Sequence, residues 1–436
     1  MKKIYFLLFL IFIGSVKLSA TTYTSAQNGN WMTPTTWSPI GIPVPGDIIV
    51  INKMITLDTS FAYTTGSILI SSTGSLLQDL PVRSIWLNGV NAAFTNNGTV
   101  DIQNLLLSAG SFTNSAQITV KAVANFIMAN NNFGGTIMSV DSLYNDGTLN
   151  NNGTINVMTF FNNNTINNYG TIQGLTTVVD SMYNAGTFLN DVGALLKADS
   201  CTNSNTFTNN GVVNFDQFTN IGTFTNTNYM SLVDMTNIGT FTNQDSLIGA
   251  GSITNTGNLD NQAGALIDLS ISFLNVDTVN ANALLTINGV FNIGDSYYNF
   301  NGVTGTSGSI TVQDTSYNSG AMTGSYDFCD ATPPATSPYI DINTGTVDPT
   351  ITYCMVGVET NEILKTVLVY PNPTNNIINI DADNGLMVEI YNLLGEQLLT
   401  SDEKVLDISG FEKGIYLIVL KDLKGNLIRQ ERIIKE

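Results

Sequence analysis

Residues 218–243 read FTNIGTFTNTNYMSLVDMTNIGTFTN, and within them the octet TNIGTFTN occurs twice, at 219–226 and at 236–243. The underlying pattern, Asn-x-Gly-Thr-apolar, recurs outward from here at intervals of 17 to 22 residues. Its aligned positions are Gly147, Asn164, Gly186, Asn205, Gly222, Gly239, Gly257, Asp277 and Gly294. A period of about 18 residues is too short for a helical-pair repeat and too long for a hairpin, but it matches one three-strand coil of a parallel β-helix.

Two asparagine columns keep the phase of this repeat. The first lies two residues before the aligned position and comprises Asn145, Asn162, Asn184, Asn203, Asn220, Asn237, Asn255, Asn275 and Asn292. The second lies four residues after it and comprises Asn151, Asn168, Asn190, Asn209, Asn226, Asn243 and Asn261. Stacked coils place equivalent residues about 4.8 Å apart, so that one side-chain amide can donate a hydrogen bond to the next. The sequence therefore predicts two asparagine ladders rather than a flexible Asn-rich linker.

Two apolar columns keep the same phase and predict the core. The first lies four residues before the aligned position and comprises Leu143, Phe160, Met182, Cys201, Phe218, Met235, Ile253, Phe273 and Val290. The second lies two residues after it and comprises Leu149, Ile166, Phe188, Phe207, Phe224, Phe241, Leu259 and Val279. One coil buries too little apolar surface to offset its loss of backbone entropy, so neighbouring coils must stabilise one another and the ends need caps.

The chain is therefore expected to be all-β, with a single-stranded parallel β-helix (solenoid) of about 18 residues per coil followed by a small antiparallel Ig-like β-sandwich. We expect a signal peptide at 1–20, an N-terminal cap and first coils at 21–80, β-helix repeats at 81–326, a Cys-flanked linker at 327–358 and a C-terminal domain at 359–436. Trp31 and Trp37 fall in the cap segment, and we interpret them as cap packing rather than as a platform for sugars.

The N-terminus has the three parts of a secretory signal. A basic pair at 2–3 precedes an apolar run at 4–13, and Leu18-Ser19-Ala20 supplies small residues for cleavage. The apolar run is shorter than the roughly 20 residues that a membrane-spanning helix needs, and no later segment is apolar for that long. We therefore expect a secreted or cell-surface protein without a transmembrane span.

Charge and composition exclude several classes of function. The chain carries 15 Lys and Arg residues against 34 Asp and Glu residues, and this net charge of −19 disfavours nucleic acid as a partner. It has no His, which removes imidazole ligands, His-based acid-base catalysis and Ser-His or Cys-His nucleophiles. The first Glu in the chain is Glu359, and the change in composition there indicates a domain boundary.

Export permits disulfides, and the chain has three cysteines. Cys329 and Cys354 flank a stretch rich in Pro and Thr, and we predict a disulfide between them that stabilises the fold by about 3 to 4 kcal/mol on the loop-entropy estimate. Cys201 falls in a core column, so we expect a small buried apolar side chain there rather than a nucleophile or a metal ligand.

The C-terminal segment has the pattern of a small antiparallel β domain with about seven short strands. It contains the motifs Tyr370-Pro371-Asn372-Pro373 and Gly414-Ile415-Tyr416, in that order. This ordered set resembles the type A sorting domain of the type IX secretion system, over residues 359–436. The resemblance implies recognition by an outer-membrane translocon and cleavage by a surface sortase, which leaves the passenger bound to surface glycolipid or released.

β-Helix folds often carry polysaccharide lyases and hydrolases, so an enzyme has to be considered. A lyase needs a basic proton acceptor with a second cation nearby. Between Arg83 and Lys365 the only basic residues are Lys121 and Lys197, which the repeat places roughly 19 Å apart. A hydrolase needs two carboxylates about 5 to 10 Å apart, a spacing that many Asp pairs on neighbouring coils satisfy. We predict no catalytic residue and no cofactor other than calcium, with a polysaccharide-active hydrolase or lyase as the alternative.

The calcium hypothesis concerns Asp180, Asp199 and Asp216, which share one column six residues before the aligned position. Carboxylates on adjacent coils repel one another, so they are either well solvated or share a cation. Oxygen ligands in a row suit Ca²⁺. The sequence leaves both readings open.

Outward threonines form a Thr-x-Thr array over three coils, at Thr206 and Thr208, Thr223 and Thr225, and Thr240 and Thr242. The array is similar to those of ice-binding β-helices, although Thr suits any exposed strand. Our main prediction is an exported, adhesin-like structural scaffold without catalysis, whose hydroxyl and amide groups contact glycans or other surface proteins. Ice binding is a minor alternative.

Overall fold

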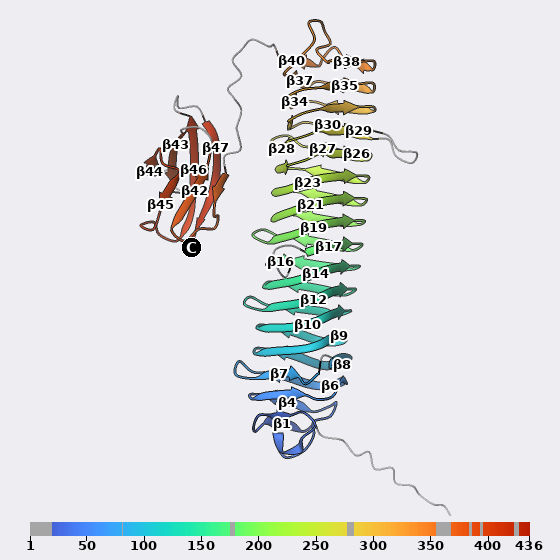
Figure 1. Cartoon of the computed structure of the whole chain (residues 1–436), viewed down its shortest axis with the longest axis vertical. Coiled ribbons are helices and arrows are strands. Elements are labelled where there is room, and N and C mark those ends of the chain that lie inside the picture. Colours follow the sequence, from blue (N-terminus) through green and yellow to red (C-terminus); the bar gives the residue numbers. More distant parts are fainter. Residues whose placement is uncertain are drawn as a thin grey trace, which may run out of the picture. The chain divides into compact units, whose positions relative to one another are not determined.

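The computed structural model describes residues 20–80, 82–174, 179–276, 283–354, 368–382, 386–392, 396–422 and 427–436. The chain divides into two compact units, residues 1–354 and 355–436 (Figure 1). Residues 1–19 of the predicted signal peptide and the predicted boundary at Glu359 lie outside the described residues. Within the described ranges, no helix combines the length and the apolar character needed to cross a bilayer.

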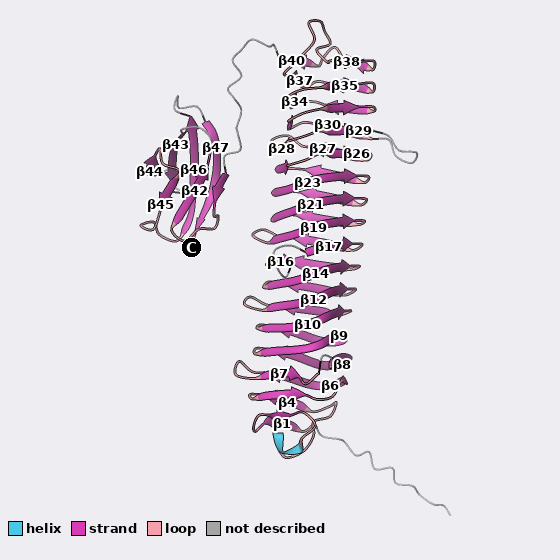
Figure 2. Ribbon diagram, viewed as in Figure 1, coloured by secondary structure: helices cyan, strands magenta, loops and turns pink. Residues whose placement is uncertain are grey.

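The first unit is a parallel β-solenoid, as predicted, with about 14 turns that follow one another about 19 residues apart. Its strands run from β1 (Thr22–Ser25) to β40 (Thr352–Tyr353) and are joined in one continuous sheet (Figure 2). One coil consists of β24 (Thr240–Asn243), β25 (Ser246–Gly249) and β26 (Ile253–Asn255). These strands pair in parallel with β27 (Asn258–Asn261), β28 (Leu266–Leu269) and β29 (Phe273–Asn275) of the next coil.

The core of the solenoid consists of stacked apolar side chains. Along the strands, buried and more exposed residues alternate, because successive side chains of a strand point to opposite faces. Phe207, Phe224 and Phe241 lie on successive coils, are fully buried, and have ring centroids 4.7 and 5.2 Å apart. The two predicted core columns are buried from their first members through Phe273 and Leu259, which confirms the phase of the repeat over this length.

Asparagine side chains form two continuous ladders inside the corners of the coils. Each Nδ2 donates to the Oδ1 of the asparagine one coil further on, at 2.7–2.9 Å. The first ladder comprises Asn125, Asn145, Asn162, Asn184, Asn203, Asn220, Asn237, Asn255, Asn275, Asn299, Asn318 and Asn343. The second comprises Asn96, Asn114, Asn131, Asn151, Asn168, Asn190, Asn209, Asn226, Asn243 and Asn261. Buried amides without partners would destabilise the fold, and the ladders supply those partners.

The phase of the repeat breaks after Asn275, and two predictions beyond it are wrong. The next residue of the first ladder is Asn299, 24 residues further on, so this coil is longer than the period used to align it. Val290 and Asn292 instead lie on β31 (Val290–Ile293), which pairs with β28, and Val290 is 42% exposed. The core position after Phe273 belongs to Tyr297, and that after Leu259 belongs to Leu285. The aligned Asp277 and the predicted core residue Val279 lie outside the described residues.

The N-terminal cap buries its aromatic side chains. Trp31 and Trp37 are 2% and 1% exposed, and their ring centroids lie 5.2 Å apart. Trp37 Nε1 donates to the Trp31 carbonyl oxygen at 2.8 Å, and the Phe61 ring lies 4.7 Å from that of Trp31. These contacts close one end of the core and leave the tryptophan rings covered.

The segment predicted to be a linker, 327–358, is instead part of the solenoid over its described residues. Its strands are β37 (Asp327–Asp330), β38 (Ile342–Asn343), β39 (Thr346–Val347) and β40. They pair in parallel with strands of the preceding coil, and β40 pairs with β37. The Pro- and Thr-rich stretch between β37 and β38 is a loop within a coil, which masks the repeat in the sequence without ending the fold.

The described residues of the second unit form two small antiparallel sheets, which confirms the predicted class of this domain. One sheet comprises β41 (Leu368–Tyr370), β42 (Ile377–Asp381) and β45 (Val405–Asp407). The other comprises β44 (Gln397–Ser401), β43 (Leu386–Tyr391), β46 (Gly414–Asp422) and β47 (Leu427–Lys435). Both sheets contribute to one apolar core, which includes Ile378, Leu406, Val388 and Ile418.

Candidate functional site

The first predicted sorting motif, at 370–373, forms hydrogen bonds to β47, the last strand of the C-terminal unit. The motif begins at Tyr370, the last residue of β41, and the side chain of Asn372 forms hydrogen bonds to β47 through both of its polar atoms. The backbone N–H of Ile434 donates to Asn372 Oδ1 at 2.9 Å, and Asn372 Nδ2 donates to the Arg432 carbonyl oxygen at 2.7 Å. The N–H of Thr374 also donates to the Ile434 carbonyl oxygen at 2.8 Å. The asparagine of the motif therefore has a structural role in this domain.

The second motif, at 414–416, opens β46 and divides its side chains between core and surface. Tyr416 is 8% exposed, and its hydroxyl donates to the Glu412 carbonyl oxygen at 2.7 Å. Ile415 is 38% exposed and Tyr370 of the first motif is 49% exposed. These two side chains are accessible to a partner that recognises the motifs.

The predicted aspartate column occupies equivalent corner positions on three coils. The pairing of Val179 with Ala198 and of Ala198 with Phe215 places Asp180, Asp199 and Asp216 in one register. Across the described ranges, however, no three acidic or cysteine side chains come together as a group that could hold a metal ion. The calcium site therefore stays a prediction and contributes nothing to the function proposed below.

The two basic residues of the repeat region lie far apart. Lys121 is on β10 (Gln117–Asn125) and Lys197 is on β19 (Leu195–Asn203), and four strand pairings separate them, through β12 (Thr136–Asn145), β14 (Thr154–Asn162) and β16 (Thr171–Gln173). At about 4.8 Å per coil, this corresponds to roughly 19 Å. Lys121 Nζ lies 3.4 Å from Asp141 Oδ2. The geometry therefore does not bring the two lysines to one sugar ring.

Among the carboxyl groups that the structure describes in the solenoid, one has a raised pKa. Burial raises the pKa of Asp268 on β28 above its ordinary value. Asp260, on β27 of the same coil, accepts a hydrogen bond from Gln262 Nε2 at 3.2 Å. The corner at 262–265 separates the two strands, so these carboxyls belong to different sides of the coil. Asp268 and Asp260 therefore do not face each other as a pair of carboxyls would in a hydrolase.

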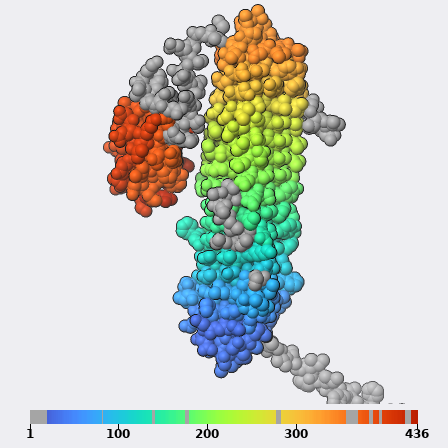
Figure 3. All heavy atoms as spheres, viewed as in Figure 1, coloured from blue at the N-terminus to red at the C-terminus, as the bar shows by residue number. Residues whose placement is uncertain are grey.

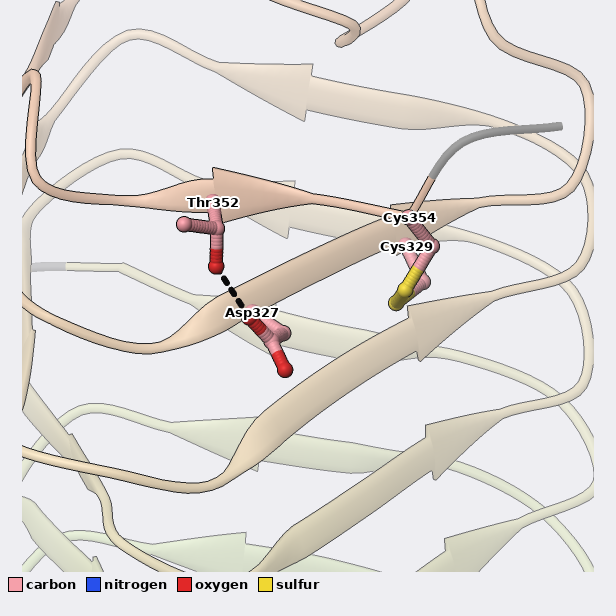
Figure 4. Close-up of a disulfide and its surroundings, with 4 residues drawn as sticks. All are labelled: Asp327, Cys329, Thr352 and Cys354. Carbon is pink, nitrogen blue, oxygen red and sulfur yellow. Dashed lines mark hydrogen bonds between the residues drawn. A yellow bond between two sulfur atoms is a disulfide. The ribbon is translucent and has the colours of Figure 1, made fainter.

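The structure joins Cys329 to Cys354 by a disulfide, with their Cα atoms 4.9 Å apart (Figure 4). The bond links β37 to the residue after β40, and a hydrogen bond between Thr352 and Asp327 joins the same two strands. Cys201 is a free cysteine at a core position, and burial raises the pKa of its thiol. The buried Cys201 thiol is inaccessible to a substrate. The disulfide, in contrast, links the last coil to the coil before it.

Outward threonines extend over more coils than the sequence pattern indicates. The Thr-x-Thr pairs on three successive coils are in register, as predicted. The first of the two columns continues back through Thr187, Thr165 and Thr148. It therefore spans six coils on one side of the solenoid. In the space-filling view, the colour of the solenoid changes steadily along its length, because each coil stacks on the one before it in the sequence (Figure 3).

An apolar hollow of about 190 Å³ lies at the N-terminal cap. Its lining includes Trp31, Pro43, Val44, Phe61 and Tyr63. Such a lining lacks the convergent polar groups of an active site, and it belongs to the closure of the core.

The apolar columns of the sequence identify the aromatic residues of the core but miss a row of aromatic side chains that point outward. Strand pairing aligns Tyr144 on β12 with Phe161 on β14, and Phe161 with Tyr183 on β17 (Val179–Asn184). We call these three residues the aromatic row. The same outward position continues through Thr202, Thr219, Thr236, Thr254, Leu274, Tyr298 and Tyr317. The signal was present in the sequence, because each of these residues directly precedes an asparagine of the first ladder.

Comparison with known proteins identifies the C-terminal unit. Residues 368–436 match the family described as "Secretion system C-terminal sorting domain", so this segment is a type IX sorting domain attached to a β-solenoid passenger. The chain is also 31% identical over 70 residues to Beta-agarase D of Zobellia galactanivorans. That stretch covers 16% of this chain and 15% of the relative, so the similarity is far too short to span the solenoid. No solved structure matches the chain.

Proposed function

We propose that this chain is an exported structural or adhesive scaffold without a catalytic centre, which acts at the cell surface or beyond it. One observation carries the proposal: a sorting domain at 368–436 follows a passenger whose described residues, from 20 to 354, build one regular solenoid. The sorting domain implies handling by the type IX secretion system and thus secretion or surface attachment. The outer-membrane translocon and a surface sortase are the proposed direct partners of the two motifs.

The surface chemistry of the solenoid supports an adhesive role. Its outward positions repeat hydroxyl and amide groups at the strand spacing, as in the six-coil threonine column. Solenoids present such repeated groups over an extended surface that a compact domain does not offer. The net charge of −19 keeps the protein soluble outside the cell and away from polyanions.

The proposal is tested by following the protein in a bacterium with a type IX system. The full chain should appear on intact cells or in the medium, where added protease reaches it. A variant that lacks residues 368–436 should stay inside the outer membrane, protected until the cells are lysed. Surface exposure of the truncated variant would contradict the proposed delivery.

A polysaccharide-active enzyme is the alternative, and two observations favour it. One is the short similarity to a beta-agarase, and the other is the raised pKa of Asp268. Incubating the full chain with agarose and with neutral and acidic glycans tests it, because cleavage generates new reducing ends or unsaturated products. Product formation that Asp268→Asn abolishes would replace the scaffold proposal with a hydrolase.

Ice binding is a second alternative, favoured by the register of the outward threonines. Thr223 lies in the middle of the array, and it pairs with Thr206 on one side and Thr240 on the other. An ice-binding surface would produce thermal hysteresis that Thr223→Tyr removes, because the larger side chain breaks the flatness of the array. A freezing point equal to the melting point at all protein concentrations would exclude this alternative.

A further inference from the structure

We propose that the aromatic row binds a neutral, linear polysaccharide whose sugar rings stack on its side chains. The inference rests on the proposed function and names the ligand of the adhesive surface. The row consists of Tyr144, Phe161 and Tyr183 on three successive coils. At about 4.8 Å per coil, the outer two residues are separated by roughly 10 Å.

Two of the three residues of the row are exposed and Tyr144 is partly buried, although large aromatic side chains usually lie in the core. Phe161 and Tyr183 are each 39% exposed, and Phe126, next to the row, is 43% exposed. The rings of Phe126 and Tyr144 lie against each other, with centroids 6.0 Å apart. Several large aromatic side chains on one side of a sheet form an exposed apolar surface of the kind that marks binding sites.

The tyrosine hydroxyls are held in place by neighbouring polar side chains. Asn163 Nδ2 donates to the Tyr144 hydroxyl at 2.5 Å. Ser204 Oγ and the Tyr183 hydroxyl lie 3.2 Å apart in a second hydrogen bond. These bonds limit the ring orientations, so less conformational entropy is lost when a ligand binds.

A row of hydroxyl-bearing residues runs beside the aromatic row. Ser142, Thr159 and Ser181 are paired on the same three coils, two residues before the aromatic positions. Residues two apart on a strand point to the same face and lie about 7 Å apart. A pyranose ring has an apolar face of C–H groups and a polar edge of hydroxyls. The two rows offer both kinds of contact at once.

The charges around the row select a neutral ligand. Asp141, Asp146 and Asp180 lie within four residues of the row, and the cation Lys121 is paired with Asp141. These carboxylates repel uronates and sulfated sugars, and the net charge of −19 adds to that repulsion. The face therefore disfavours acidic polysaccharides.

The continuation of the row indicates an extended polymer rather than a short sugar. Nine strand pairings separate Tyr144 from Tyr317, which is about 43 Å along the solenoid. At the far end, Tyr298 and Phe300 form a second aromatic cluster with Tyr317, at centroid distances of 6.4 and 5.1 Å. A chain that contacts both clusters gains affinity from their linkage.

Affinity electrophoresis of the full chain tests the proposal. The protein is run through native gels that contain agarose, laminarin, xylan or, as the acidic control, alginate. The double variant Tyr144→Ala/Phe161→Ala removes two rings of the row. The matched control Phe133→Ala/Tyr169→Ala removes two rings elsewhere, which are 92% and 45% exposed. Thermal unfolding verifies that all variants fold, and Phe161→Tyr tests whether ring stacking alone suffices.

We expect at least one neutral polysaccharide to retard the wild type and the control variant, with retardation unchanged by about 0.5 M salt because no ion pair is involved. The row variant should bind about tenfold more weakly or worse, and Phe161→Tyr should bind normally. Equal retardation of the row variant, retardation by alginate alone, or no retardation by any neutral polysaccharide would overturn the proposal. Protease accessibility of the same variants on intact cells separates the two proposals, because delivery depends on residues 368–436 and not on the row.

Discussion

The asparagine ladders can be tested by removing one amide from the middle of the first ladder. Asn220 is fully buried, its Oδ1 accepts from Asn203 Nδ2 at 2.9 Å, and its Nδ2 donates to Asn237 Oδ1 at 2.8 Å and to the Thr240 carbonyl oxygen at 2.9 Å. Asn220→Ala deletes these three contacts and leaves polar atoms of two buried neighbours without them. With about 1 kcal/mol for each bond and a further penalty for buried atoms that lose their partners, we predict a local destabilisation of about 3 to 5 kcal/mol.

Hydrogen exchange read by mass spectrometry is the appropriate assay, because a repeat protein opens locally and its coils contact only their neighbours. The amides of the coils on either side of residue 220 should exchange two to more than three orders of magnitude faster, since about 1.4 kcal/mol corresponds to a factor of ten. Asn152→Ala changes an exposed asparagine and should alter local stability by less than about 0.5 kcal/mol. Asn343→Ala, at the end of the ladder, loses one amide contact and should have an intermediate effect.

An isosteric variant separates the hydrogen bonds from the volume of the side chain. Asn220→Asp keeps the shape but directs an oxygen at Asn237 Oδ1 and at the Thr240 carbonyl, both of which are acceptors. Its ionised form is disfavoured there, so the variant should be least stable at neutral pH and should recover as the carboxyl becomes protonated in acid. If Asn220→Ala and Asn152→Ala exchange at the same rate, the ladders do not stabilise the solenoid.

Other predictions concern the disulfide, the free cysteine, one carboxyl and the calcium hypothesis. Cys354→Ser opens a loop with a sequence separation of 25 residues and should cost about 3 to 4 kcal/mol, seen as faster hydrogen exchange confined to the last coils; unchanged exchange there would contradict this. Cys201 should resist iodoacetamide in the native protein and react in denaturant, because it is buried and burial raises its pKa. The raised pKa of Asp268 means that the folded state favours the protonated carboxyl, so the stability from this group is present in acid and is lost as the pH rises through its titration. Asp268→Asn should therefore melt at a higher temperature than the wild type at pH 7. A difference in melting temperature that persists at about pH 3 would argue against burial as the cause. A calcium site at the aspartate column requires that Ca²⁺ raise the melting temperature of the wild type but not of Asp199→Asn, and an unchanged wild type refutes it.

The fold of the solenoid was predictable because its stabilising contacts repeat with the chain. Each coil must place an amide and an apolar side chain over their counterparts one coil earlier, and this leaves columns that can be read directly from Asn145 to Asn275. The prediction failed at Val290 and Asn292 because the step from Asn275 to Asn299 is 24 residues long, whereas the alignment assumed a nearly constant period. The end of the solenoid was not recognised for a similar reason. The Pro-rich loop between β37 and β38 lengthens the spacing between strands, so that the repeat is no longer visible in the sequence.

The candidate binding surface was less predictable, for a different physical reason. Core positions are constrained by packing, so their residue types reveal them, whereas outward positions accept many side chains. Tyr144, Phe161 and Tyr183 each directly precede an asparagine of the first ladder, so their spacing follows the repeat. The spacing indicates an exposed row only when it is known which side of the strand faces solvent. The motifs of the sorting domain were recognisable without a structure, although the role of Asn372 in holding β47 was not.

Asn203 pairs with Asn220, and Asn220 pairs with Asn237. Two consecutive coils therefore pair with the next coil in the same register, with a spacing of 17 residues. A gene duplication or deletion of one such unit would change the height of the molecule by about 4.8 Å while every new junction resembled an old one. Evolution can therefore adjust the length of the solenoid without redesigning its interior.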